Sequence, residues 1–305
     1  MLRSQKPNSG RLILRTVAVA LVAVVMSGAF AQIAFAATKK PSSVAYRGLG
    51  SWVDIYEDKA WANPTATVAD MKSHGVRTIY LETGNSRQKT AIFKPAAQSA
   101  FIRAAHARGM KVVAWYLPDL KNVNSDYSRI AAAIKFRTAD GQRFDSFALD
   151  IESSAVTPVS TRNSRLDTLT KKIRKVAGAS YPLGAIIPSP VGMSKNKTYW
   201  KGFPYKSLAA QYNAFVPMSY YTYHGKGAAA ATADTLSNIR IIRAQPGCKT
   251  IPIHLIGGIA DDSTTAEVKA FVAATQKARV SGASFYSWTG TSAAAWKALS
   301  AIKVR

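Results

Sequence analysis

The sequence predicts an α/β fold, a single (β/α)8 TIM barrel that follows an N-terminal signal peptide. Eight apolar, β-rich runs alternate with eight helix-patterned stretches, which is the element order of such a barrel. No low-complexity linker divides residues 37–305, and roughly 270 residues is a usual size for one such domain. A doubly wound open sheet is the alternative. However, Gly48-Leu49-Gly50 lies inside the first run and lacks the third glycine of a dinucleotide-binding turn.

Each predicted strand is a run of Val, Ile, Leu and aromatic residues between glycine, proline or polar residues. The strands are predicted over residues 44–56, 77–83, 111–117, 143–152, 182–189, 214–223, 251–258 and 282–290. Residues at the helix ends mark the stretches between them: Thr65 caps the first helix, Pro95 opens the second, and Gly109 ends it. The helices are predicted over residues 65–74, 95–108, 125–136, 161–177, 205–212, 230–244, 264–279 and 292–302.

Residues 1–36 have the pattern of a secretory signal peptide. An apolar run, TVAVALVAVVMSGAFAQIAFA, ends at the small-residue cleavage site Ala34-Phe35-Ala36. We expect cleavage after Ala36 and a secreted or cell-envelope-associated protein without stable membrane insertion. The alternative is an N-terminal membrane anchor, because the apolar run is nearly long enough to span a bilayer. Four basic residues and no acidic residue precede the run: Arg3, Lys6, Arg11 and Arg15.

The chain is strongly basic, with 41 Lys and Arg residues against 16 Asp and Glu residues and a net charge of +25. Removal of the leader would leave about +21 (25 − 4). Such an excess favours polyanionic partners. Because the basic residues are spread over nearly every predicted helix and the leader indicates export, we expect contact with anionic cell-wall polymers and no nucleic-acid partner. A highly charged exoprotein without such a partner is the alternative.

The cysteine and histidine content gives no indication of a cofactor. Cys248 is the only cysteine, which excludes a disulfide framework and a cysteine-based metal site within one chain. The four histidines show no metal-ligand spacing. We expect no metal, no cofactor and a monomer.

Two acids share one face of the fourth predicted strand, in the stretch RFDSFALDIESS at residues 143–154. Side chains alternate across a strand, and the carboxyl ends of barrel strands surround the open end that holds reactive groups. The residues expected to face inward are therefore Ser146, Ala148, Asp150 and Glu152. The residues expected to pack under the helices are Phe147, Leu149 and Ile151.

The spacing of these two acids favours proton chemistry. Carboxylates with Cα atoms about 6.6 Å apart repel each other, so one stays protonated near neutral pH. A protonated carboxyl suits a general acid that cleaves a glycosidic bond. The alternative is a structural ion pair with Arg47 or Arg77 on neighbouring strands, because buried carboxylates are usually paired.

Three short motifs resemble those of family 18 glycoside hydrolases, the chitinase-like barrels. FDSFALDIE resembles the fourth-strand signature D-x-x-D-x-D-x-E through Asp145, Asp150 and Glu152. PMSYY resembles the sixth-strand motif M-x-Y-D, with Tyr220 in place, and FYSWT resembles the eighth strand, with Trp288 in place. LDIE together with WVDIY is also similar to family 25, muramidase-like barrels, in which an acid after the first strand joins a D-x-E pair.

The family 18 resemblance implies a role for each matching residue. Glu152 would protonate the leaving oxygen, and Asp150 would orient the 2-acetamido group that attacks the anomeric carbon. Tyr220 would hydrogen-bond that acetamide. An alternative within the enzyme class makes Asp54 the second carboxylate. The expected polysaccharide-binding residues are Trp288, which would stack beneath the sugar, and Asp54, Glu82, Tyr116, Tyr221 and Trp52.

Two departures from the family 18 pattern keep a second hypothesis open. Ala148 replaces the middle Asp of the fourth-strand signature, and Tyr221 replaces the last Asp of M-x-Y-D. The sequence therefore indicates either a divergent glycosidase acting on an N-acetylhexosamine polymer of chitin or peptidoglycan type, or a non-catalytic glycan-binding barrel of the envelope. A basic scaffold that touches anionic polymers without a cleft is a third, more remote hypothesis.

Overall fold

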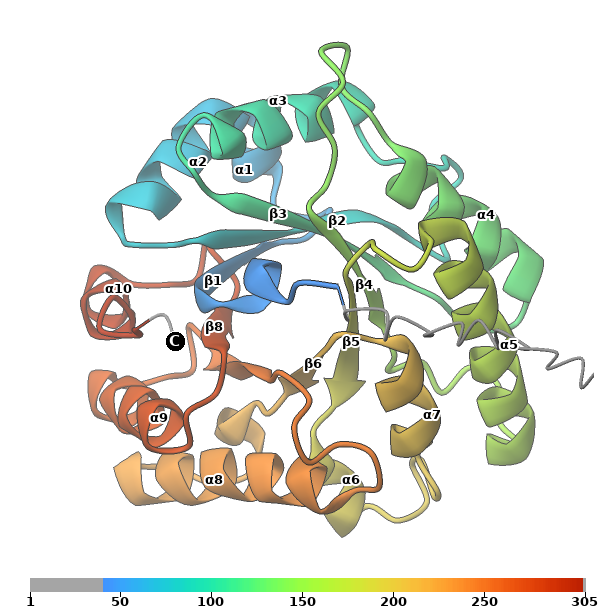
Figure 1. The fold of residues 1–305 in the computed structure, drawn as a ribbon. Coiled ribbons are helices and arrows are strands. Elements are labelled where there is room, and N and C mark those ends of the chain that lie inside the picture. The colour runs from blue at the N-terminus through green and yellow to red at the C-terminus, as the bar shows by residue number, and fades with distance from the viewer. Residues whose placement is uncertain (1–40, 304–305) are drawn as a thin grey trace, which may run out of the picture. The chain divides into compact units, whose positions relative to one another are not determined.

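Eight parallel strands close into a barrel in the order in which they occur along the chain (Figure 1). The computed structural model describes residues 41–303, so the predicted signal peptide lies outside the described residues. The barrel confirms the predicted (β/α)8 fold, and β8 pairs with β1 to close it. The strands are β1 (Gly48–Val53), β2 (Thr78–Asn85), β3 (Lys111–Leu117), β4 (Ser146–Asp150), β5 (Leu183–Pro188), β6 (Ala214–Met218), β7 (His254–Ile259) and β8 (Gly282–Tyr286).

Helices surround the barrel, as Figure 1 shows. They are α1 (Asp58–Ala62), α2 (Pro64–Ser73), α3 (Pro95–His106), α4 (Val123–Lys135), α5 (Val159–Ala177), α6 (Pro190–Lys195), α7 (Tyr205–Gln211), α8 (Ala228–Ala244), α9 (Thr265–Lys277) and α10 (Ala293–Leu299). Helices α1 and α6 were not predicted, because five and six residues carry too little apolar periodicity. No helix within residues 41–303 combines the length and the apolar character that a membrane crossing needs.

Two predicted strands are shorter in the structure because 3-10 helices occupy part of their length. Residues Tyr221–Tyr223 form η2, and β6 ends at Met218. Tyr220 between them has a φ of 38°, in the left-handed region, and this interrupts the extended chain. At the start of the chain, Val44–Tyr46 form η1 instead of the beginning of β1.

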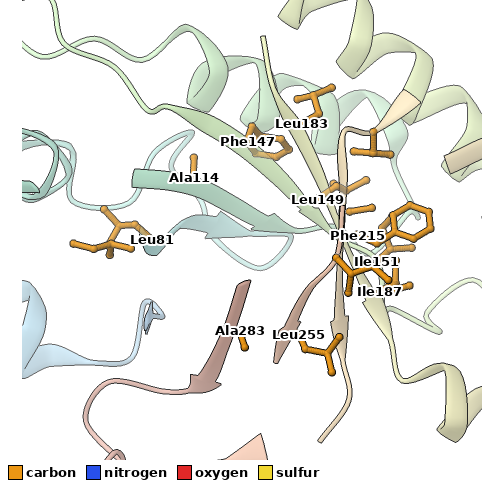
Figure 2. Close-up of a cluster of buried hydrophobic side chains, with 14 of the residues drawn as sticks. Leu81, Ala114, Phe147, Leu149, Ile151, Leu183, Ile187, Phe215, Leu255 and Ala283 are labelled. Carbon is orange, nitrogen blue, oxygen red and sulfur yellow. The ribbon is translucent and has the colours of Figure 1, made fainter. Parts of the chain in front are cut away.

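The larger hydrophobic core lies between the strands and the helices. Phe147, Leu149 and Ile151 belong to this core and are each at most 1% exposed, and Figure 2 shows them among its other members. Ala148 belongs instead to the core inside the barrel. The predicted alternation of inward and outward side chains on β4 is therefore confirmed, and it directs the side chain of Asp150 inward.

The barrel interior is filled by aromatic side chains. Trp52 stacks on Tyr80 with ring centroids 4.2 Å apart, and its indole nitrogen donates a hydrogen bond to Ser284 Oγ at 2.8 Å. At the amino end, the Tyr46 hydroxyl of η1 lies 2.6 Å from Ser146 Oγ. Any Cβ on Gly184 would approach Tyr46 Cζ to 2.7 Å, so glycine is required there. The interior is thus a packed floor beneath the carboxyl ends of the strands.

Candidate active site

Five carboxylates gather at the carboxyl end of the barrel, which we call the mouth. Asp54 and Glu57 follow β1, Glu82 lies in the second half of β2, Asp150 ends β4, and Glu152 follows it. Their charges act on one another: Glu152 and Glu82 raise the pKa of Asp150, and Asp54 raises the pKa of Glu57 and of Glu82. Within residues 41–303, no Lys, Arg or His nitrogen lies within ion-pair distance of any of the five. The mouth is therefore an acidic site without counter-ions.

The ion-pair alternative is wrong for Asp150 and Glu152. Arg47 and Arg77 precede β1 and β2, so they lie at the amino ends of those strands. The carboxyl ends of parallel strands meet at the opposite end of a barrel, which places both arginines away from the two acids. Neither arginine forms an ion pair among the described residues.

Asp150 is a buried carboxyl group with an unused hydrogen-bonding position. Its residue is 6% exposed, and Oδ1 accepts no hydrogen bond. Burial, followed by the charges of Glu152 and Glu82, holds the pKa of Asp150 well above its usual range. The carboxyl group therefore keeps its proton at pH values where an exposed aspartate is ionised.

Glu152 is only partly buried, and burial raises its pKa as well. Its backbone carbonyl accepts a hydrogen bond from the hydroxyl of Tyr199, in the segment between α6 and α7. Burial, with the charges of Glu152 and Asp150, raises the pKa of Tyr199 to about 12. The sequence does not indicate Tyr199 as a site residue, because it follows no predicted strand and matches no motif.

Tyr220 lies beside the acid pair. Burial and then the charges of Asp150 and Glu152 raise the pKa of its hydroxyl. The left-handed backbone at Tyr220 turns the chain directly after β6. The structure thus brings together the three residues that the family resemblance singled out for catalysis.

Two more buried acids lie near Asp54, namely Glu82 on β2 and Glu57 beside Ser287 and Thr289, which follow β8. Glu82 accepts hydrogen bonds from the Ile55 backbone N–H at 3.0 Å and from Asn85 at 3.2 Å, and burial raises its pKa to about 7. Glu57 is 7% exposed, and burial raises its pKa to about 7. The Ser287 and Thr289 hydroxyls and the Thr289 backbone N–H oppose this rise, although none of them makes a hydrogen bond of good geometry to the carboxylate. Asp54 accepts a hydrogen bond from the hydroxyl of Tyr286. Sequence analysis predicted Asp54 and Glu82 here but missed Glu57 and Tyr286.

The structure corrects the predictions for Tyr116 and Tyr221, which both lie on the outer side of the barrel. Tyr116 is 1% exposed in the strand–helix core and donates a hydrogen bond to Asp126 at 2.9 Å. Tyr221 is equally buried and donates to Ser263 Oγ at 3.0 Å. Because side chains alternate along β3, the residue that faces inward is Trp115, whose indole N–H has no partner.

Trp288 and Trp52 are also placed differently from the prediction. Trp288 lies two residues beyond β8, packs against the strand–helix core and donates a hydrogen bond to Asp70 of α2 at 2.8 Å. Its side chain is directed toward α2, and Tyr286 occupies the inward position at the end of β8. Trp52 faces inward but is 2% exposed and covered, so it forms part of the floor.

No cluster for a metal ion is present among the described residues. No group of three or more His, Cys, Asp or Glu side chains within residues 41–303 is arranged to hold one.

Comparisons with known proteins find similarity in structure but not in sequence. No protein-family model and no curated protein matches the sequence. The endo-β-1,4-mannanase from Thermotoga petrophila has a TM-score of 0.61 at 11% identity, covering 80% of this chain and 68% of that chain. The chitinase from Chromobacterium violaceum ATCC 12472 has a TM-score of 0.56 at 12% identity, covering 83% and 98%. The glycoside hydrolase domain of PgaB (BpsB) from Bordetella bronchiseptica has a TM-score of 0.56 at 11% identity, covering 83% and 98%.

These similarities define the class of fold. The chain shares the (β/α)8 barrel fold of a mannanase, a chitinase and a glycoside hydrolase domain, which is the fold that the sequence predicted. At 11% to 12% identity the likeness extends to the fold alone. The resemblance to family 25 muramidases stays a prediction.

Proposed function

We propose that the protein is an exported glycoside hydrolase that cleaves an N-acetylhexosamine-containing polysaccharide of chitin or peptidoglycan type. The observation that carries the proposal is a pair of acids, Asp150 and Glu152, with raised pKa values and no cationic partner at the mouth of the barrel. A structural pair of this kind would be neutralised by a nearby base. A buried acid pair without a base lowers the stability of the fold, and a catalytic role would explain why the protein contains one.

Glu152 is the proposed general acid because its side chain is partly exposed and its pKa is raised. It would donate its proton to the glycosidic oxygen as the bond from that oxygen to the anomeric carbon breaks. The carbonyl oxygen of the substrate's own acetamide would attack the anomeric carbon. This route suits two acids on one strand, because they cannot stand on opposite sides of the scissile bond.

Asp150 and Tyr220 would hold the acetamide in place. The buried Asp150 carboxyl has a free oxygen that can accept a hydrogen bond from the acetamide N–H. The hydroxyl of Tyr220, beside the same pair, can donate to the acetamide carbonyl. Both contacts would orient the attacking oxygen before proton transfer begins.

Glu82 offers a replacement for the missing aspartate at Ala148. In the barrel, Glu82 of β2 and Ala148 of β4 are both in register with Trp115 of β3 and belong to the inward-facing rows of their strands. The charge of Glu82 acts on Asp150. We propose that Glu82 supplies from β2 the acidic support that the family 18 signature supplies from β4.

A non-catalytic glycan-binding barrel is the second candidate. It is favoured by the departures at Ala148 and Tyr221, the latter being buried against the strand–helix core. A Glu152→Gln variant distinguishes the two. If the protein is a hydrolase, the variant should release at least about 100-fold fewer reducing ends from chito-oligosaccharides or peptidoglycan while still binding them. Absence of hydrolysis by the unmodified protein, with binding retained, would favour the second candidate.

A matched control is Asp167→Asn on α5, an acid in a surface pair with Lys171. It removes one acid at a surface site on α5 and should leave hydrolysis unchanged.

Export and wall association are parts of the same proposal. The leader pattern supports export, and the net positive charge supports retention near anionic cell-wall polymers. High salt should elute such a protein from whole cells, because charge-based retention is screened. Retention that is insensitive to salt would contradict charge-based association.

A further inference from the structure

Acidic and basic residues are distributed differently between the two ends of the barrel. Every acid within residues 41–303, apart from Asp70, Asp140 and Asp145, lies in the second half of a strand, in the loop after it or in the first half of the next helix. Those positions are toward the mouth, whereas basic residues occur toward both ends. The end where the strands begin, which we call the amino end, therefore has an excess of positive charge.

The acids next to the start of β4 already have basic partners. Asp145 lies 2.8 Å from Lys111 and 2.9 Å from His106, and Asp140 lies 3.8 Å from Arg103. Five other bases at the amino end are exposed and have no ion-pair partner within residues 41–303. We call them the basic ring: Arg47, Arg77, Arg143, Lys249 and Arg279.

Helix dipoles do not explain the basic ring. Cations are favoured in the last turn of a helix, and the last turns of α2, α3, α4, α5, α8, α9 and α10 each contain one. The residues of the basic ring lie outside these helices, shortly before β1, β2, β4, β7 and β8. Because these strands are distributed around most of the barrel, the basic ring surrounds the amino end and does not line a single groove.

A hollow of about 460 Å³ at the amino end can receive a phosphate group. Its lining includes Arg137, Arg143, His106 and Asp145. The charge of Asp145 is balanced by Lys111, and both arginines are exposed. Guanidinium groups bind phosphate oxygens through paired hydrogen bonds, so the hollow suits an anionic headgroup.

The amino end also has an exposed apolar residue and the point where the chain enters the barrel. The 3-10 helix η1 lies here, because Tyr46 contacts Ser146 and His254, the first residues of β4 and β7. Val44 of η1 is 45% exposed. The described chain begins at residue 41, directly before η1. The predicted leader is therefore joined to the barrel at its amino end.

We propose that the amino end of the barrel binds the surface of a membrane that contains anionic phospholipids, with the mouth directed away from the membrane. Phosphate headgroups neutralise the basic ring, and the apolar boundary beneath them accommodates Val44. A single strand of an anionic wall polymer would contact only one side of the ring and leave Val44 exposed. The inference goes beyond the proposed function and does not depend on hydrolysis, so either can fail without the other.

Co-sedimentation of the full-length protein with lipid vesicles tests the proposal. The vesicles contain phosphatidylcholine alone or with roughly 30% phosphatidylglycerol. In low salt we expect the anionic vesicles to bind at least about 30-fold more tightly than the neutral ones, because each basic residue near such a surface adds about 5-fold. This advantage should fall at least about 10-fold in roughly 0.5 M salt. Equal binding to both kinds of vesicle would overturn the inference.

Two matched double variants locate the surface. Arg77→Gln with Lys249→Gln removes one arginine and one lysine from the amino end, and Arg87→Gln with Lys226→Gln removes the same charges from loops at the mouth; all four residues are exposed. The net charge and any contribution of the leader are thus the same in both. The first should weaken binding to anionic vesicles about 10- to 25-fold and the second less than about 3-fold. Equal losses would refute the placement at the amino end.

Two further measurements separate a membrane from a wall polymer. Val44→Asn should weaken vesicle binding about 3- to 5-fold because its apolar contact is lost, and an unchanged Kd would refute contact through η1. A soluble poly(glycerol phosphate) is the probe for the polymer. Tighter binding of this polymer than of anionic vesicles at equal phosphate concentration would overturn the inference and assign the basic ring to a wall polymer.

Discussion

Replacing Glu57 with glutamine should stabilise the protein at pH 8 and leave its stability unchanged at pH 4. The native side chain is 7% exposed, lacks a hydrogen-bond partner of good geometry and has no cation nearby. Glutamine has nearly the same shape and no charge. It therefore removes the cost of burying a carboxylate, while its amide oxygen can keep the weak contacts that Ser287 and Thr289 make with Glu57.

The size of the effect follows from the pKa of Glu57. Burial raises it from 4.5 to about 7. The folded protein therefore holds the proton more tightly than the unfolded chain does, and the stability contribution of this group falls as pH rises from about 4.5 to about 7. Above pH 7 the full penalty is present, and at ~1.36 kcal/mol per pKa unit it amounts to about 3 kcal/mol.

Denaturant unfolding monitored by tryptophan fluorescence at both pH values measures this difference. We expect Glu57→Gln to gain about 2–3 kcal/mol at pH 8, which is about 5–10 °C in Tm for a domain of this size, and less than about 0.5 kcal/mol at pH 4. Asp167→Asn serves as the control and should shift neither value by more than about 0.5 kcal/mol. An equal gain at both pH values, or none at pH 8, would refute the reasoning.

Four further variants test the placement of other residues. Trp288→Phe should change the Kd for N-acetylhexosamine oligomers by less than about 2-fold, whereas Trp115→Phe should weaken binding about 5- to 10-fold because the indole N–H is lost. Calorimetry measures both Kd values. Equal losses in the two variants would contradict the outward placement of Trp288 and the inward placement of Trp115. Gly184→Ala should destabilise the fold by about 1–3 kcal/mol because its Cβ would press on Tyr46, and an unchanged urea midpoint would argue against that contact. Asp150→Asn should reduce hydrolysis at least about 100-fold and raise Tm at pH 8, and a lowered Tm would show that the buried carboxylate stabilises the fold.

The inward direction of Asp150, Glu152 and Tyr220 could be predicted because each lies at the end of a well-marked strand or within two residues of it. On β4 the alternation was readable, since Ser146, Asp150 and Glu152 are polar and the residues between them are apolar. The barrel itself could be predicted from eight alternating units. These features depend on local pattern, which the sequence carries directly.

The wrong predictions of side-chain direction arose where the sequence pattern does not distinguish the two faces of a strand. In KVVAWYL, strand β3 is apolar throughout, so nothing in the sequence shows that Trp115 and not Tyr116 faces inward. At β8 the alternation no longer applies once the strand ends at Tyr286, which is why Trp288 packs against the strand–helix core. Tyr199 lies in a loop, where position depends on tertiary packing and not on periodicity.

The 3-10 helix η1 has a consequence for the maturation of the chain. It places Tyr46 inside the barrel, in contact with Ser146 and with its backbone carbonyl 3.1 Å from His254. The segment Val44–Tyr46 is thus an internal part of the barrel and not a dispensable tail. Proteolytic trimming that removed Tyr46 would leave a void opposite Gly184, and Ser146 and His254 would each lose a hydrogen-bond contact. The trimmed barrel should therefore unfold more readily, even though every residue of the mouth is intact.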